Sequence, residues 1–216
     1  MALDIKICGL KTAPAVEAAL AGGASHVGFI FFPKSPRNVS PDQAGALREK
    51  ARGQARTVAV TVDADDAALD AIVASMAPDM LQLHGRETPA RVAEVKARYG
   101  LPVMKALAVS TAADLAAAQP FFTVSDRMLF DAKPPKGSEL PGGNGVAFDW
   151  SLLAALDPGV DYMLSGGLNS ANVGDALRIG NPPGIDVSSG VESTPGVKDT
   201  ALMDDFFAAV RAARAR

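Results

Sequence analysis

The segment YMLSGGLNSANVGDALRIGNPPGIDVSSG, residues 162–190, holds the pattern that decides the fold. A short apolar run at 162–165 ends in a Gly-Gly turn, and a helix-forming stretch follows at 169–177. A second apolar run at 185–187 ends in another glycine-bearing turn. A strand, a helix and a second strand in this order form two parallel strands joined by a crossover. The segment therefore predicts an α/β protein built on a parallel sheet.

The same alternation of apolar runs and alanine-rich stretches continues through the whole chain of 216 residues. Eight strand–helix units favour a closed (β/α)8 TIM barrel, and an open doubly wound sheet is the competing architecture. No composition break marks a boundary, so we expect a single domain over residues 1–216, with a long Gly- and Pro-rich loop at 133–148. The expected strands cover residues 5–8, 26–31, 56–61, 80–83, 103–106, 128–131, 162–165 and 185–187, and the expected helices cover 13–21, 41–52, 65–77, 89–99, 111–119, 150–156, 169–177 and 200–214.

The side-chain pattern of the expected strands also favours a barrel. Alternate residues of a strand face opposite sides, so Lys6 and Cys8 share one side of the first expected strand. Gln82 and His84 share a side of the fourth, and Asp186 lies on the polar side of the eighth. An isolated charge facing the helices would cost several kcal/mol. The polar side is therefore expected to face the barrel interior and its mouth, where barrel enzymes carry their chemistry.

Composition and charge limit the kinds of function that the chain can have. A net charge of −3 and a pI of about 5.4 give no sign of a surface for nucleic acid or anionic membranes. The longest strongly apolar stretch, HVGFIFF, is far too short to cross a bilayer. The single cysteine excludes an internal disulfide and suits a reducing compartment, and the segment MALDIKICGL does not resemble a signal peptide. We therefore expect a cytoplasmic protein that binds neither nucleic acid nor membranes.

Two glycine-bearing turns, LSGGLN at 164–169 and DVSSGVE at 186–192, close the last two expected strands. Glycine lets backbone N–H groups approach an anion closely, and a following helix N-terminus adds a favourable dipole. The loops after the seventh and eighth strands of such barrels are a recurrent phosphate site. One such turn is usually only a tight connection, but two in these positions predict a phosphate-bearing ligand. Asp186 would repel a phosphate, so we expect it to have a structural role inside the barrel.

Cys8 and Asp131 each end an expected strand and form a candidate acid–base pair. A lone cysteine is usually a small buried hydrophobic residue, and an aspartate after a strand often only begins a turn. The first and sixth strands of a barrel are far apart around the ring, so the two side chains would lie on opposite sides of a bound substrate. A thiolate and a carboxylic acid there would remove one proton and deliver another.

Arg37 and His84 are further candidates for the site. Arg37 lies in FFPKSPRNVS, a loop stiffened by prolines, and an arginine can bind a carboxylate through two hydrogen bonds, although a solvated loop arginine is the common alternative. His84 ends the run QLH on the inward side of its strand and is either a substrate-binding residue or a satisfied histidine at the rim. The sequence has no cluster at metal-ligand spacing and no nucleotide-binding motif, so no metal or cofactor is expected.

Seven segments, spread in order over nearly the whole chain, carry a resemblance to one enzyme family. They are KICGLK at 6–11, VGFIFFPKSPRNVS at 27–40, LQLHG at 81–85, LFDAK at 129–133, GGNGVAFDW at 142–150, LSGGLN at 164–169 and GIDVSSGVE at 184–192. Together they resemble the phosphoribosylanthranilate isomerases, which are barrel enzymes of tryptophan biosynthesis. Asn144 stands where that family usually has threonine, and Ser165 where alanine is common.

The resemblance implies an Amadori rearrangement of N-(5-phosphoribosyl)anthranilate to 1-(2-carboxyphenylamino)-1-deoxyribulose 5-phosphate. In family terms, Asp131 would be the general acid on the ribose ring oxygen, and Cys8 the general base at the adjacent sugar carbon. Arg37 would hold the anthranilate carboxylate, and no cofactor would be needed. We expect a monomer or a homodimer, since no sequence feature indicates a symmetric interface. The residues expected around the phosphate are Gly166, Gly167, Ser188, Ser189 and Gly190.

Three alternatives stay open on the sequence. The histidine-pathway aminoaldose isomerase is a related barrel with the same rearrangement, but that family resembles a two-aspartate design, against which Cys8 argues. A non-catalytic phosphosugar-binding barrel would have little reason to keep both Cys8 and Asp131. A Schiff-base aldolase would need a reactive lysine, and Lys6 and Lys105 lack a clear context for that role.

Overall fold

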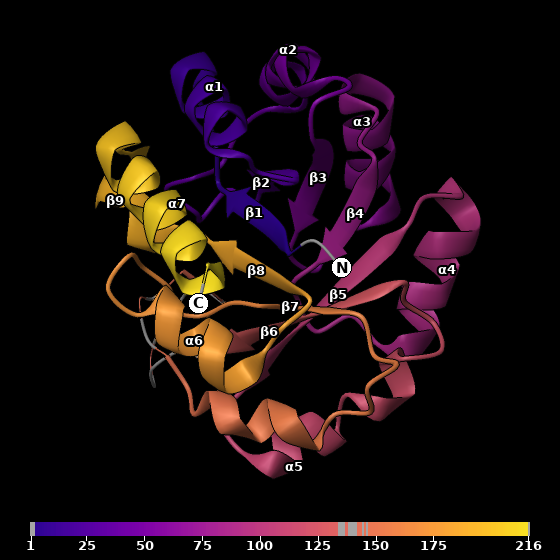
Figure 1. The fold of residues 1–216 in the computed structure, drawn as a ribbon. Coiled ribbons are helices and arrows are strands. Elements are labelled where there is room, and N and C mark those ends of the chain that lie inside the picture. Colours follow the sequence, from indigo (N-terminus) through magenta and orange to yellow (C-terminus); the bar gives the residue numbers. More distant parts are fainter. Residues whose placement is uncertain (1–2, 134–136, 138–141, 144, 146, 216) are drawn as a thin grey trace.

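A computed structural model describes residues 3–133, 137, 142–143, 145 and 147–215 of the chain. Eight parallel strands form a closed barrel in sequence order, and β1 pairs with β8 to complete the ring (Figure 1). This arrangement confirms the expected (β/α)8 TIM barrel and excludes the open doubly wound sheet. The strands are β1 (Asp4–Cys8), β2 (His26–Phe31), β3 (Arg56–Thr61), β4 (Met80–Leu83), β5 (Val103–Val109), β6 (Arg127–Ala132), β7 (Tyr162–Leu164) and β8 (Gly184–Val187).

Helices surround the barrel, and several begin where the sequence supplies a cap (Figure 1). The Ser40 hydroxyl accepts a hydrogen bond from the Gln43 N–H, and the Thr88 hydroxyl accepts one from Arg91, each just before a proline that opens the helix. The α-helices are α1 (Ala13–Gly22), α2 (Pro41–Ala51), α3 (Asp66–Met76), α4 (Pro89–Tyr99), α5 (Ala112–Ala116), α6 (Val173–Gly180) and α7 (Thr200–Arg214), and the 3-10 helices are η1 (Gln119–Phe121), η2 (Trp150–Ala155) and η3 (Ser189–Val191).

Three expected helices differ from the structure. The helix expected at 111–119 is only the short α5, and the separate 3-10 helix η1 follows it. The helix expected at 169–177 begins only with α6, because the Asn169 and Asn172 side chains accept hydrogen bonds from nearby backbone N–H groups and form a turn first. The helix expected at 150–156 is the short 3-10 helix η2. Asp149 caps η2 by accepting a hydrogen bond from the Ser151 N–H. The element therefore begins at the expected residue, but it is a 3-10 helix and not an α-helix.

The chain after β8 forms a small antiparallel hairpin that the sequence pattern does not predict. Its strands are β9 (Glu192–Thr194) and β10 (Val197–Lys198), which lie between η3 and α7. Strands this short carry too few side chains to show a period of two. Within the long loop expected at 133–148, Asn144 lies outside the described residues.

Two apolar layers fix which side chains face the barrel interior. The larger layer lies between strands and helices and includes Ile7 and Phe130. Ile7 and Phe130 are the strand neighbours of Cys8 and Leu129, and neighbours on a strand face opposite sides of the sheet. Cys8 and Leu129 therefore point into the barrel, as expected. The inner cluster consists of Cys8, Val58, Val60, Met80, Met104, Ala106, Leu129 and Met163.

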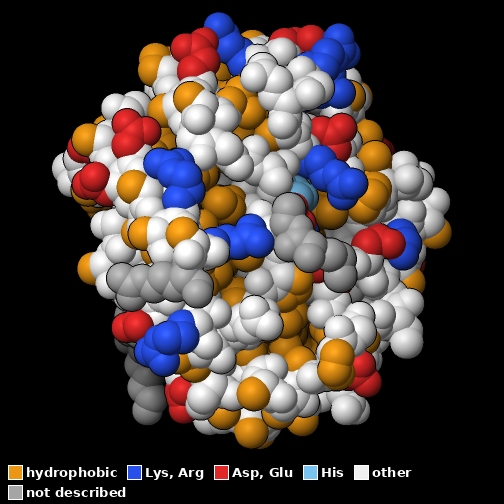
Figure 2. All heavy atoms as spheres, viewed as in Figure 1, with side chains coloured by type: hydrophobic (Ala, Val, Ile, Leu, Met, Phe, Trp, Pro, Cys, Tyr) orange, Lys and Arg blue, Asp and Glu red, His pale blue; other side chains and the backbone are white. Residues whose placement is uncertain are grey.

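Charged side chains of both signs are intermingled on the molecular face shown in Figure 2. Lys and Arg side chains lie close to Asp and Glu side chains around this face, which agrees with the small net charge of −3. Within the described part of the chain, no helix is long and apolar enough to cross a bilayer.

Candidate active site

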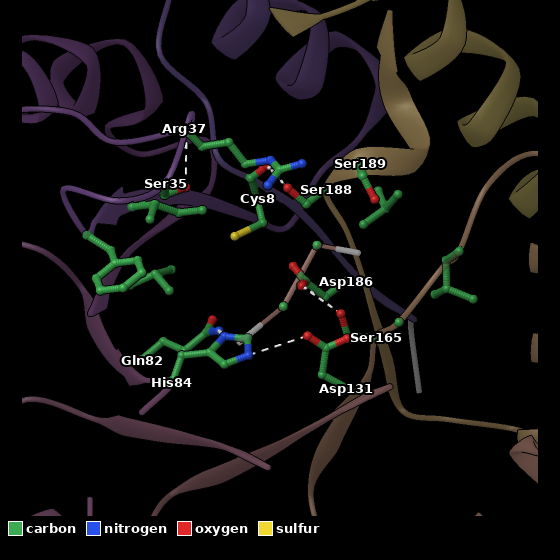
Figure 3. Close-up of a pocket in the computed structure, with 18 of the residues that line it drawn as sticks. Cys8, Ser35, Arg37, Gln82, His84, Asp131, Ser165, Asp186, Ser188 and Ser189 are labelled. Atoms are coloured by element: carbon green, nitrogen blue, oxygen red, sulfur yellow. Dashed lines mark hydrogen bonds and ion pairs between the residues drawn. The ribbon is translucent and has the colours of Figure 1, made fainter. Parts of the chain in front are cut away.

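A cavity opens at the carboxyl ends of the strands, the end at which barrel enzymes carry their active sites. Its walls come from segments that are far apart in the sequence, from the end of β1 to the turn after β8 (Figure 3). Gly190, an expected phosphate residue, lies in η3 outside this lining, where a Cβ would overlap the Leu168 carbonyl oxygen. The expected site residues that do line the cavity are Cys8, Arg37, His84, Asp131, Gly166, Gly167, Ser188 and Ser189.

Cys8 and Asp131 enter the cavity from opposite sides (Figure 3). Each stands at or near the carboxyl end of its strand, on the inward-facing side. Both are nearly buried, with relative exposures of 5% for Cys8 and 4% for Asp131. The backbone N–H of Ala132 donates to Asp131 Oδ1 over 2.9 Å. The fold therefore brings the two candidate acid–base residues to one shared space.

The charges around Cys8 act on its thiol in opposite directions. Burial raises the pKa of Cys8, the Lys6 and Lys198 ammonium groups oppose that rise by stabilising the thiolate, and Asp186 adds to it. Burial also acts to lower the pKa of Lys6, but the negative charges of Asp186 and Cys8 outweigh it and raise that pKa. A protonated Lys6 therefore stays beside the thiol as a counter-charge.

Asp186 lies inside the barrel rather than in the turn that follows its strand. Lys6 Nζ donates to Asp186 Oδ1 over 2.8 Å, and Ser165 Oγ donates to Asp186 Oδ2 over 3.1 Å. These bonds agree with a structural role, but Asp186 also lines the cavity, which the sequence analysis did not predict. The contact with Asp186 is one that alanine at position 165 would lack. Lys105 Nζ is likewise paired, at 2.8 Å from Glu87 Oε2, so neither buried lysine is presented as a free amine for a Schiff base.

His84 joins β4 to Asp131. Gln82 Nε2 donates to His84 Nδ1 over 3.0 Å, which leaves the ring proton of a neutral imidazole on Nε2. His84 Nε2 lies 3.4 Å from Asp131 Oδ2, so that proton faces the carboxyl group. The histidine is thus held by protein groups while its side chain also lines the cavity.

Arg37 is not the solvated loop arginine that its position in the sequence allows. Its relative exposure is 4%, and it lines the cavity at the end of the loop after β2. Arg37 Nε and Nη2 donate to the two carboxylate oxygens of Glu192, each over 2.8 Å. This two-point ion pair fixes the plane of the guanidinium group beside the cavity.

The two glycine-bearing turns lie beside each other on the cavity wall. Gly166 and Gly167 have φ values of +92° and +63°, a backbone conformation that side chains disfavour, so both positions need glycine. Ser188 Oγ donates to the Cys8 carbonyl oxygen over 3.1 Å, which ties the turn after β8 to the end of β1. The expected direct start of a helix after Gly167 is not found, since α6 begins at Val173.

Four further residues at the site were not identified from the sequence. Glu192 and Lys198 come from the unpredicted hairpin, and each is almost fully buried against Arg37 or Ser188. Gly142 and Gly143 approach the cavity closely, because a Cβ at Gly142 would overlap Asp131 Oδ2 and one at Gly143 would lie 2.8 Å from Arg37 Nη1. The segment GGNG and the glutamate of SGVE were the available signals, but neither indicates a partner by itself.

A closed eightfold barrel with carboxyl, thiol and cationic side chains around a cavity at its carboxyl end is typical of the class of (β/α)8-barrel enzymes. The model for the family described as N-(5'phosphoribosyl)anthranilate (PRA) isomerase matches residues 5–209. The chain belongs to this family. Among the described residues, no group of three or more His, Cys, Asp or Glu side chains is arranged to hold a metal ion.

Individual relatives agree with the family match. The chain is 76% identical over 214 residues to N-(5'-phosphoribosyl)anthranilate isomerase of Mesorhizobium japonicum, covering 99% of this chain and 98% of the relative. It is 65% identical to the enzyme of the same name from Brucella canis, covering 100% and 97%. A crystal structure of phosphoribosyl anthranilate isomerase from Thermotoga maritima superposes with a TM-score of 0.87 at 32% identity, covering 98% of this chain and 100% of that one.

A second solved structure of a phosphoribosyl anthranilate isomerase contains reduced 1-(O-carboxyphenylamino)-1-deoxyribulose 5-phosphate. It superposes on this chain with a TM-score of 0.85 at 29% identity, covering 98% of this chain and 100% of that one. The ligand in that protein carries both a carboxylate and a phosphate, which are the two anionic groups expected here from the sequence.

Proposed function

We propose that this protein catalyses the Amadori rearrangement of N-(5'-phosphoribosyl)anthranilate to 1-(2-carboxyphenylamino)-1-deoxyribulose 5-phosphate, the isomerisation step of tryptophan biosynthesis. Membership of the isomerase family supports this assignment, as does the ligand bound in a related structure. The observation that carries the catalytic part is the placement of Cys8 and Asp131 on opposite sides of one cavity. An aldose-to-ketose shift needs one proton delivered and one removed, and each of these side chains can do one.

Asp131 is the general acid of the proposed reaction. It gives a proton to the ribose ring oxygen while the bond from that oxygen to C1 breaks, and the nitrogen lone pair of the anthranilate forms a C=N bond to C1. The carboxylate that remains accepts the Ala132 N–H over 2.9 Å and lies 3.4 Å from His84 Nε2. These two donors stabilise the negative charge that develops as the proton leaves.

Cys8 is the general base of the second step. Its thiolate removes the proton from C2, the electrons of that C–H bond form a C1–C2 double bond, and the C=N electrons return to nitrogen. The resulting enolamine becomes the ketose when the C2 hydroxyl loses its proton and C1 gains one. The reaction moves only protons and electron pairs, so acid and base side chains suffice for it. Burial raises the pKa of Cys8, and the positive charges of Lys6 and Lys198 limit that rise and so favour the thiolate form that this step requires.

The remaining cavity groups bind the two ends of the substrate in this proposal. Arg37 holds the anthranilate carboxylate, because a buried guanidinium group is a strong and directional partner for a carboxylate. Gly166 and Gly167 on one turn, and Ser188 and Ser189 on the other, hold the phosphate through backbone N–H groups. With both ends held, the sugar lies between the acid and the base.

We further infer the setting in which this chemistry takes place. Residues 1–216 act as one barrel domain on a small phosphorylated molecule. A lone thiol suits a reducing compartment, which favours the cytoplasm. A monomer and a homodimer both fit, and one related isomerase is described as a dimer from which monomers were generated.

A fluorescence assay tests the assignment. The purified protein is mixed with freshly made N-(5'-phosphoribosyl)anthranilate, and the loss of substrate fluorescence is followed with and without protein. We expect rapid loss with this substrate. In a parallel assay that measures the ketose product directly, we expect no turnover of the aminoaldose of the histidine pathway. No acceleration over the protein-free sample would contradict the proposed function, and turnover of the aminoaldose would contradict its assigned specificity.

A further inference from the structure

The β9–β10 hairpin places two buried charges directly behind the cavity wall. Glu192 begins the hairpin and Lys198 ends it, and their side-chain exposures are 3% and 2%. Lys198 Nζ donates to Glu192 Oε1 over 2.6 Å. Burying an ion pair is costly unless each charge has further partners, so the other contacts of these two side chains show what the pair holds in place.

We propose that Glu192 and Lys198 are positioning residues of the active site, Glu192 for Arg37 and Lys198 for Ser188 and Cys8. Neither side chain lines the cavity, so each acts through another residue. The inference rests on the proposed function and deepens it, because it assigns a task to a hairpin that neither the barrel nor the acid–base pair explains.

Glu192 sets the direction in which Arg37 can bind a ligand. Its two oxygens take the Nε and Nη2 donors of Arg37, each over 2.8 Å, and its Oε2 also accepts the Gly196 N–H over 3.1 Å. An arginine has five N–H donors in one plane, so the donors on Nη1 and the second one on Nη2 stay available. Arg37 Nη1 lies on the side of Gly143, which itself lines the cavity. The substrate carboxylate therefore meets a guanidinium group whose orientation is already fixed.

Lys198 holds the start of the turn after β8. Its Nζ donates to the Ser188 carbonyl oxygen over 2.8 Å and lies 3.3 Å from Ser188 Oγ. Ser188 Oγ in turn donates to the Cys8 carbonyl oxygen over 3.1 Å. Lys198 thus links the proposed phosphate turn to the residue that carries the base.

The charges of this cluster do not cancel. Arg37 and Lys198 are cationic and Glu192 is anionic, so one positive charge is left over beside a cavity proposed to take a substrate with two anionic groups. Burial lowers the pKa of Lys198, while the charges of Glu192 and Cys8 oppose that change. The lysine charge also favours the Cys8 thiolate, so its removal should raise the pKa of the base.

The test compares two charge-removing variants, Glu192→Gln and Lys198→Met, with the wild-type protein in the fluorescence assay. We expect Glu192→Gln to raise KM about 10-fold with a smaller change in kcat, because Arg37 loses its fixed orientation. In the pH profile of kcat/KM, activity should rise with pH as the Cys8 thiol loses its proton. We expect Lys198→Met to shift this rise to higher pH by about 0.5 unit or more. The groups facing Cys8 are Lys6, Asp186 and Lys198, with Arg37, His84 and Asp131 around the same cavity.

A second buried lysine–glutamate pair supplies the matched control. Lys105 Nζ lies 2.8 Å from Glu87 Oε2, both side chains are buried, and neither lines the cavity. Glu87→Gln and Lys105→Met should lower the melting temperature by an amount similar to the hairpin variants, since each leaves a buried charge without its partner. They should not shift the pH profile, because neither residue is among the charges that act on Cys8.

The possible outcomes separate this inference from the proposed function. If wild-type protein turns over the substrate while both hairpin variants keep wild-type KM and pH profile, the inference is wrong and the proposed function stands. If wild-type protein shows no turnover, the proposed function fails and the inference fails with it. Should either variant not fold, Glu192→Asp and Lys198→Arg keep the charge but change its reach. Because these variants keep the charge, the pH profile should stay near that of the wild type while KM rises, and a wild-type KM in both would equally overturn the positioning role.

Discussion

Strands β1 and β6 are separated by β7 and β8 in the ring, and each carries a polar side chain at either end, with opposite results. At the amino ends, Asp4 of β1 and Arg127 of β6 meet, and Arg127 Nη1 donates to Asp4 Oδ2 over 2.6 Å. At the carboxyl ends, Cys8 and Asp131 of the same two strands lie on opposite sides of a cavity. At one end of the barrel the two strands are joined by an ion pair, and at the other their side chains line a cavity.

The difference shows how one interior can serve stability and chemistry at once. Arg127 Nη2 also lies 3.1 Å from Asp161 Oδ1, so its guanidinium group is ion-paired with two carboxylates of the protein. Cys8 and Asp131 have no such partner in each other, and their reactive atoms face the space where a substrate would lie. Residues at the carboxyl ends of barrel strands are accordingly expected to govern turnover, and residues at the amino ends to govern the free energy of unfolding.

The largest expected effect is the loss of turnover on changing the acid or the base. Cys8→Ser and Asp131→Asn should each lower kcat by at least about 10²–10⁴-fold, because each removes one proton transfer. Circular dichroism should show an intact fold in both. Asp4→Asn is the matched control at the other end of β1 and should keep wild-type kcat. Near-normal turnover in Cys8→Ser or Asp131→Asn would contradict the role proposed for that residue.

A smaller effect is expected for Arg37→Lys. The lysine keeps the positive charge but cannot make the two-point contact with Glu192. The cation that binds the substrate carboxylate would therefore no longer be held in a fixed orientation. We expect KM to rise about 10–100-fold, the equivalent of one to two charged hydrogen bonds, with kcat less affected. Arg91→Lys, on the surface of α4, is the control, and an unchanged KM in Arg37→Lys would show that Arg37 does not bind the substrate.

At the amino end, Arg127→Met should change stability and leave catalysis alone. The variant removes a buried guanidinium group and leaves Asp4 and Asp161, which are partly exposed, so the loss should be about 1–3 kcal/mol rather than the larger cost of stranding a buried charge. Urea unfolding measures the first quantity and the fluorescence assay the second. If Arg127→Met were fully folded but had a reduced kcat, the ion pair at the amino end would influence catalysis at the carboxyl end.

The smallest expected effect concerns pH and His26, which lies near Asp4 and Arg127. Burial lowers the pKa of His26 from 6.5 to about 4, with Arg127, Lys6 and Arg56 adding to the change and Asp4 opposing it. The folded protein then binds fewer protons than the unfolded chain between these values, so stability is full above pH 6.5 and falls as the pH drops toward 4.

His26→Asn should flatten that part of the stability curve while leaving the acid loss from carboxyl groups such as Asp4 in place. The measurement is the urea midpoint from pH 7 down to pH 4.5 for both proteins. Parallel curves would show that His26 does not contribute to the pH dependence of stability.

Much of the fold could be predicted because its signals are local. The apolar runs gave strands that agree with the structure to within a few residues, and strand parity placed Cys8 and Lys6 inside the barrel. The start of α6 could not be predicted, since the Asn169 and Asn172 side chains compete for the backbone groups that a helix would use. The β9–β10 hairpin has no period long enough to detect.

The sequence by itself determined the order of strands and helices, the face on which each strand residue lies, and the motifs that carry the family resemblance. The tertiary structure alone decided which distant charges meet. Arg37 and Glu192 are 155 positions apart, and Lys6 and Asp186 are 180 apart, yet both pairs lie within hydrogen-bond distance. Spacing along a chain sets local geometry, whereas the pairing of buried charges depends on closing the ring between β1 and β8, which no short segment encodes.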